Sequence, residues 1–167
     1  MKSSWALAAL MLAGCATTPQ PSPADQWFGR LSALCGRAFE GRLLSAGPAR
    51  ASFAGQKLVM HVRQCSGQEI RIPFHVGADR SRTWAVTRTA SGLRLKHDHG
   101  HEDGSSDALT MYGGDSRGAG TAQRQEFPAD AESIALFTAQ ARAVSNTNVW
   151  AIVVADRHFA YGLRRPP

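Results

Sequence analysis

Hydrophobic and polar residues alternate along much of the chain after residue 36. Between residues 56 and 64, Leu58, Met60 and Val62 alternate with polar residues, and residues 68–76 repeat the pattern. Alternate side chains of a strand point to one face, so this period predicts half-buried strands. The Ser66-Gly67 pair between the two segments predicts a tight hairpin. Further strands are expected at residues 37–44, 82–88, 93–101, 107–114, 121–127, 149–154 and 158–163.

Two segments carry a helical period instead. In residues 24–35 apolar side chains recur three and four positions apart, Asp25 can cap the start, and Gly36 ends the segment. A second helix is predicted over residues 130–143, with Asp130 as its cap.

A short N-terminal helix, an antiparallel meander of about eight strands and one late helix predict a mainly β domain. The strands are expected to form a closed or nearly closed barrel. Their order over Asp25–Leu163 resembles the calycin architecture of lipocalins and fatty-acid-binding proteins.

Residues 1–14 have the features of a targeting segment. Lys2 is basic, and the apolar run that follows is far shorter than the roughly 20 residues of a membrane-spanning helix. The run ends in Leu12-Ala13-Gly14-Cys15, which resembles the lipobox of bacterial lipoproteins. The resemblance implies cleavage before Cys15, lipid on its sulfur and amino group, and, with Ala16 next, sorting to the outer membrane. The alternative is an ordinary secretory signal that contains a cysteine by chance.

The chain after the leader divides into a tether and one domain. Residues 15–23 are small, polar and rich in proline, a composition that suits a flexible tether behind the lipidated Cys15. Residues 24–167 are long enough for one β-rich domain with its own core.

Two cysteines remain in the domain. In an exported protein, Cys35 and Cys65 are expected to form a disulfide that closes a loop of about 30 residues. The alternative is a metal site or a catalytic thiol.

The chain is basic, with a formal net charge of +6. Export and the absence of a basic stripe interleaved with aromatic residues exclude nucleic acid as an expected partner. The expected partners are the membrane, through the lipid anchor, and a small ligand or another envelope protein.

Three histidines continue the apolar face of one strand. Leu93 and Leu95 alternate with charged residues, and the same parity places His97, His99 and His101 on one side. Paired imidazoles on a strand can bind zinc or copper, with His101, Glu102 or Asp103 as the third ligand. The alternative is a polar hairpin end in which the histidines bond to the carboxylates of Asp98, Asp103 and Asp107.

Aromatic residues are the candidates for a ligand cavity. If the barrel encloses one, its walls are expected to include Trp84, Tyr112, Phe127 and Trp150. Ser105 and Ser106 lie in a turn without a nucleophile motif, so no catalytic residue is predicted.

Four segments, residues 92–107, 112–115, 124–130 and 145–150, resemble an uncharacterised family of proteobacterial secreted proteins and lipoproteins. This resemblance implies no activity. The sequence therefore favours a lipid-anchored, noncatalytic β-barrel module without a cofactor, which binds a small ligand or a partner. A zinc- or copper-binding carrier or hydrolase is the alternative.

Overall fold

The computed structural model of this chain describes residues 20–45 and 48–166. The first part contains α1 (Pro23–Ser32), β1 (Ala38–Gly41), η1 (Pro48–Phe53), β2 (Leu58–His61), β3 (Gln64–Cys65), β4 (Glu69–Val76) and β5 (Asp79–Thr89). The second part contains β6 (Gly92–His99), β7 (Tyr112–Asp115), β8 (Arg124–Pro128), α2 (Ala131–Ala139), η2 (Ala143–Ser145), β9 (Val149–Val154) and β10 (Phe159–Arg164).

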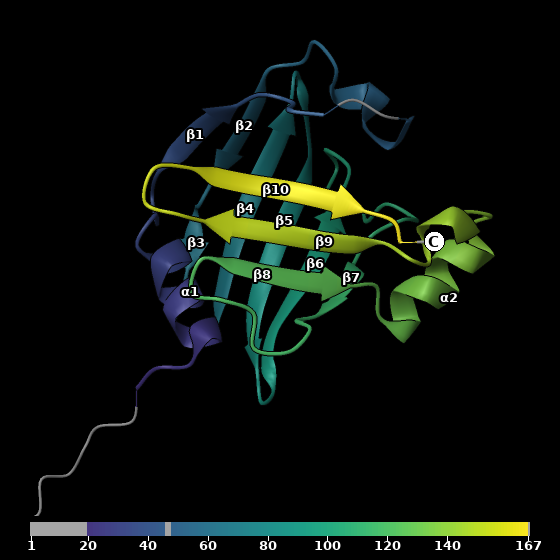
Figure 1. Ribbon diagram of the computed structural model, residues 1–167. Helices are drawn as coiled ribbons and strands as arrows, with labels where there is room; N and C mark the ends of the chain where they lie inside the picture. Colours follow the sequence, from purple (N-terminus) through teal and green to yellow (C-terminus); the bar gives the residue numbers. More distant parts are fainter. Residues whose placement is uncertain (1–19, 46–47, 167) are drawn as a thin grey trace, which may run out of the picture.

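The strands form two antiparallel sheets that face each other (Figure 1). The larger sheet has the order β1-β2-β4-β5-β6-β7, with β3 also paired to β4, and the smaller has the order β10-β9-β8. The mainly β meander with a short N-terminal helix and one late helix is thus confirmed. The sheets of the described residues do not close into a barrel, because β1 pairs with β2 alone and β10 with β9 alone.

The second helix has the predicted cap, Asp130, whereas the first begins at Pro23 with Ser22 as its cap, so Asp25 is its third residue and not the predicted cap. Ser22 and Asp25 form a capping box at the start of α1, and Asp130 accepts a hydrogen bond from the Ser133 amide at the start of α2. Both helices end earlier than predicted. The strand predicted over residues 107–114 is also shorter, because it begins only at Tyr112. Residues 107–111 form a loop, in which the Asp107 carboxylate accepts from the Leu109 amide and Met111 has a φ of 54°.

The core lies between the two sheets and under α1. Trp27 is fully buried, and its Nε1 donates to the carbonyl oxygen of Ile152 at 3.3 Å. Phe127 packs edge-on against Trp27 at a centroid distance of 6.2 Å. All core side chains of the described residues lie between Ala24 and Leu163. A protein that begins at Ala16, directly after the predicted lipidation site, therefore retains all of them.

The predicted parity of β6 is confirmed for its inner face. Leu93, Leu95 and His97 are buried, His99 is half-buried and His101 is exposed. The pairing of β6 with β5 runs without interruption from Gly92 to His99, so no bulge reverses the faces.

The charged residues that alternate with Leu93 and Leu95 are expected on the solvent side, but one of them, Lys96, is buried, with 9% of its surface exposed. It does lie on the outer face, where the start of α2 covers it. Its Nζ lies 2.7 Å from an Asp130 carboxylate oxygen and 3.3 Å from a Glu132 oxygen. Two carboxylates therefore balance the buried ammonium charge, as the burial of a charged group requires.

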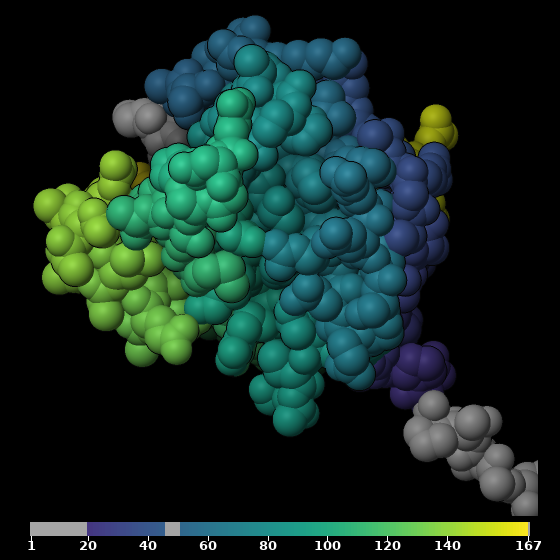
Figure 2. All heavy atoms as spheres, turned by 180° about the vertical axis from the view of Figure 1, so that it is seen from behind, coloured from purple at the N-terminus to yellow at the C-terminus, as the bar shows by residue number. Residues whose placement is uncertain are grey.

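Most other residues on the outer face of the larger sheet are polar and half-buried or exposed, and β4–β6 lie at its centre when the molecule is seen from behind (Figure 2). Ion pairs cross between strands there. Arg71 pairs with Asp98, and Arg94 bonds to both carboxylate oxygens of Asp115 at 2.6 and 3.0 Å.

The two glycines of the Tyr112–Asp115 segment allow close backbone contacts. A Cβ on Gly113 would lie 1.9 Å from the Leu95 carbonyl oxygen, and a Cβ on Gly114 would lie 1.9 Å from that of Pro128. Gly113 also exchanges hydrogen bonds with the Ser133 hydroxyl. The backbone of β7 thus packs too closely against its neighbours to leave room for a Cβ at either position.

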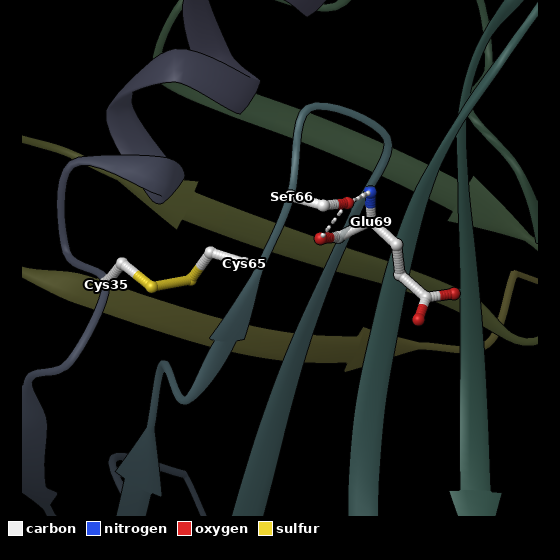
Figure 3. Close-up of a disulfide and its surroundings, with 4 residues drawn as sticks. All are labelled: Cys35, Cys65, Ser66 and Glu69. Atoms are coloured by element: carbon white, nitrogen blue, oxygen red, sulfur yellow. Dashed lines mark hydrogen bonds between the residues drawn. A yellow bond between two sulfur atoms is a disulfide. The ribbon is translucent and has the colours of Figure 1, made fainter.

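The predicted disulfide is present between Cys35 and Cys65, and it joins the turn after α1 to β3 (Figure 3). The predicted hairpin follows directly. The Ser66 hydroxyl accepts from the Gln68 and Glu69 amides, and the Ser66 amide donates to the Glu69 carbonyl oxygen at 2.8 Å. The disulfide therefore cross-links the end of the N-terminal helix region to the larger sheet.

The predicted leader and Cys15 lie outside the described residues. Within residues 20–45 and 48–166, no helix has the length and apolar character needed to cross a membrane.

Candidate functional site

A groove of about 840 Å³ lies between the two sheets. It is lined by the edge strand β1 of the larger sheet, by the edge strand β10 of the smaller sheet, and by the inner faces of the strands behind them. Six of the apolar or aromatic side chains along it are Met60, Phe74, Trp84, Phe137, Trp150 and Tyr161. The gap between the sheets is thus a concave site with a largely apolar wall.

A stack of aromatic rings builds one wall. Trp84 on β5 lies nearly parallel to Phe74 on β4, with centroids 4.5 Å apart, and to Tyr161 on β10, with centroids 4.4 Å apart. Such stacked pairs add about 0.5–1.5 kcal/mol each beyond their buried area. The stack therefore fixes the separation of the two sheets at this point.

His97 connects the sheets behind this wall. Its Nδ1 lies 3.1 Å from the carbonyl oxygen of Tyr112, and its Nε2 lies 2.6 Å from the hydroxyl of Tyr161. A carbonyl oxygen only accepts, so Nδ1 carries the proton and donates. Nε2 is then the acceptor for the Tyr161 hydroxyl, which fixes the tautomer of the ring.

Burial keeps the imidazole neutral. The His97 ring is stacked on that of Tyr112, with centroids 4.7 Å apart, and its centroid lies 4.9 Å from that of the Trp150 ring. Removal from water, opposed in part by the Tyr112 carbonyl, lowers the pKa of His97 to about 3. A base this weak is not suited to proton abstraction near neutral pH.

Tyr112 and His99 form a second polar pair at the groove wall. The Tyr112 hydroxyl lies 3.2 Å from His99 Nε2. Burial raises the pKa of Tyr112 to about 12, and burial together with the Arg82 charge lowers the pKa of His99. Both groups are therefore neutral polar groups near neutral pH.

The four predicted metal ligands are not brought together. His97 is behind the wall, His99 is at the wall, and His101 and Asp103 are exposed in the turn beyond β6. Asp103 accepts from the amide and hydroxyl of Ser105. The described residues contain no group of three or more metal-binding side chains, and a metal on His97 would have to displace Tyr112 or Tyr161.

The alternative interpretation, a polar hairpin end, predicted the wrong hydrogen-bond partners for the histidines. We expected bonds to the carboxylates of Asp98, Asp103 and Asp107, but the partners of His97 and His99 are tyrosines. The Asp98 carboxylate is instead turned to the outer face, where it pairs with Arg71.

Three of the four predicted cavity residues line the groove: Trp84, Tyr112 and Trp150. Phe127 instead lies deep in the core against Trp27. Tyr161 was missed, although Phe159, Tyr161 and Leu163 alternate along the last strand in the period of an inward face.

Ser145 lines the groove, whereas Ser105 lies in the exposed turn beyond β6. Ser105 donates to Asp103 in an exposed turn, and Ser145 accepts from Arg165. Neither serine has a histidine as a hydrogen-bond partner among the described residues, so neither resembles an activated nucleophile.

Comparisons with family models, curated proteins and solved structures found no match to this chain.

Proposed function

We propose that this chain is a lipid-anchored protein of the cell envelope whose domain binds a small ligand without catalysis. The observation that carries the proposal is the groove of about 840 Å³ between the sheets. Small-molecule sites have volumes of about 300–1,000 Å³ and mostly apolar walls with a few placed polar groups. The aromatic wall with Tyr112, His99 and Tyr161 fits this description.

The groove is also held in place before any ligand enters. The Trp84 stack and the bond from Tyr161 to His97 both connect the larger sheet to β10. A site whose walls are fixed in advance loses less conformational entropy on binding. These contacts support a binding function for the space between the sheets.

Sequence features support the location of the protein. Leu12-Ala13-Gly14-Cys15 has the pattern of a lipobox, and the tether after it separates lipid from domain. The Cys35–Cys65 disulfide suits an oxidising compartment such as the periplasm. We infer attachment to the outer membrane through Cys15, with the domain in the periplasm.

An uncharged fluorescent probe tests the binding function. N-phenyl-1-naphthylamine, titrated into the chain from Ala16 to Pro167, is expected to bind at one saturable site with increased fluorescence. Leu109 is half-buried at the groove wall, so Leu109→Trp adds bulk to the groove and should abolish the signal. Ile134→Trp makes the matched change on the exposed surface of α2 and should preserve binding.

The proposal is wrong if the probe does not saturate, or if Leu109→Trp and Ile134→Trp bind it equally well. Far-ultraviolet circular dichroism of both variants confirms that the comparison concerns folded protein.

A further inference from the structure

The charged residues along the groove are almost all basic. Glu40 is the one carboxylate residue along its wall, and its Oε2 lies 2.9 Å from Nζ of Lys57. The basic side chains are those of Arg42, Arg82, Arg142, Arg157 and Arg165. The wall therefore carries an excess of positive charge that the protein's own carboxylates do not balance.

The arginines differ in how they are partnered. Arg82 forms an ion pair with Asp79. Within the part of the chain that the structure describes, Arg165 bonds to neutral groups, at 2.7 Å from the Asn148 side-chain oxygen and 3.4 Å from the Ser145 hydroxyl. Among residues 20–45 and 48–166, the Arg142 guanidinium has no ion-pair partner. At least two of these cations are thus available to an external anion.

Arg82, Arg142, Tyr112 and His99 all line the groove. Arg82 on β5 is opposite His99 on β6 in the strand register, and His99 Nε2 lies 3.2 Å from the Tyr112 hydroxyl. The Arg142 amide donates to the carbonyl oxygen of Phe137, whose ring packs against that of Tyr112 with centroids 5.3 Å apart. The charges of both arginines also oppose the effect of burial on the pKa of Tyr112. Guanidinium, hydroxyl and imidazole groups gathered in this way can all donate hydrogen bonds to an anion.

The remainder of the wall suits an alkyl body. Trp84 is stacked between the rings of the two sheets, with Phe74 and Tyr161 parallel to it. The side chains of Leu58, Met60 and Leu109 line the groove beside these rings. Such a surface favours flexible apolar chains.

We propose that the groove binds a small anionic amphiphile, with its alkyl body between the sheets and its carboxylate or phosphate beside Arg82, Tyr112 and Arg142. This inference rests on the proposed function, and it adds the chemical class of the ligand. The charge complementarity of the wall is the observation that selects an anion.

Three probes with the same chain and different heads test the inference. Dodecanoate, dodecanol and dodecyltrimethylammonium are titrated below their micellar concentrations into the chain from Ala16 to Pro167, by calorimetry. Charge-assisted hydrogen bonds favour the anion, so we expect dodecanoate to bind about tenfold more tightly than dodecanol. The ammonium probe should bind most weakly, and added salt should weaken dodecanoate binding alone.

Arg142→Gln, compared with Arg117→Gln, tests the position of the anion. Both arginines are exposed and both substitutions remove one charge, but Arg117 lies outside the groove. Arg142→Gln should weaken dodecanoate binding about three- to tenfold and leave dodecanol binding unchanged. Arg117→Gln should alter neither.

The outcomes separate the two proposals. Equal binding of dodecanol and dodecanoate, with no effect of Arg142→Gln, overturns the inference of an anionic ligand and leaves the binding function intact. Tighter binding of the ammonium probe also overturns it. Failure of all three probes to bind contradicts both proposals.

Discussion

The Nε2 atom of His97 accepts a hydrogen bond at 2.6 Å from the hydroxyl of Tyr161, a residue 64 positions later in the chain. His97 belongs to β6 of the larger sheet and Tyr161 to β10 of the smaller. This bond holds the edge strand β10 across the groove, and it gives the buried histidine a structural role.

Removing the Tyr161 hydroxyl should destabilise the domain. Tyr161→Phe leaves His97 Nε2 buried without a donor, which costs about 1–3 kcal/mol. Urea unfolding of the chain from Ala16 at pH 7.5 measures the loss. The same substitution in a His97→Leu background is the control, because the acceptor is already absent. Equal losses in both backgrounds would show that the bond contributes nothing.

His97 should also make stability depend on pH. Its pKa is about 3 in the folded protein, against 6.5 for an ordinary histidine. Between these values the unfolded chain binds a proton that the folded protein excludes, so stability falls as the pH falls, by about 1.4 kcal/mol per pH unit. Above about pH 6.5 this contribution is constant.

His97→Gln provides the comparison for that pH dependence, since glutamine does not titrate and can still accept from Tyr161. The wild type should be more stable than the variant at pH 7.5, and this difference should narrow between pH 6.5 and pH 4. A difference that stays constant over that range would contradict a neutral buried His97.

The disulfide should be fully formed in the native protein. Alkylation without reductant is expected to label neither Cys35 nor Cys65, and mass spectrometry checks this. Replacing both by serine should lower the free energy of unfolding by about 3–4 kcal/mol without changing the fold, on the chain-entropy model for a closed loop of 30 residues. Quantitative labelling of either thiol would show that the bridge does not form.

Cys15 should be required for anchoring. A Cys15→Ser chain is expected to keep its leader and to incorporate no labelled fatty acid, because the lipid-accepting thiol is gone. Wild-type labelling of the variant would disprove lipidation at this residue. Cys35→Ser is the matched control and should be labelled normally.

Local patterns were enough to predict much of the fold. Alternation predicted the inward face of β6, Asp130 caps α2 as expected, and the Ser66-Gly67 signal marked a hairpin. The cap of α1 is Ser22, three residues before the predicted Asp25. Each of these depends on neighbours within a few residues. The pairing of Cys35 with Cys65 followed because only two cysteines remained in the domain.

Features that depend on distant contacts were not predictable in this way. Lys96 is buried only because the start of α2 docks 34 residues later in the chain, and Tyr161 meets His97 only because β10 crosses the larger sheet. The arginines of the groove likewise come from separate loops and strands. Their convergence follows from topology, which alternation along one strand does not reveal.

The tryptophan side chains report most directly on the central claim that the groove is a ligand site. Trp84 and Trp150 line the groove, whereas Trp27 is buried in the core with its Nε1 bonded to Ile152. In a ¹H–¹⁵N spectrum of the chain from Ala16, dodecanoate should shift the Trp84 and Trp150 indole signals with one saturable curve. The Trp27 signal should remain in place. Indole signals that stay unchanged at saturating dodecanoate, or that all move together without saturating, would contradict the claim.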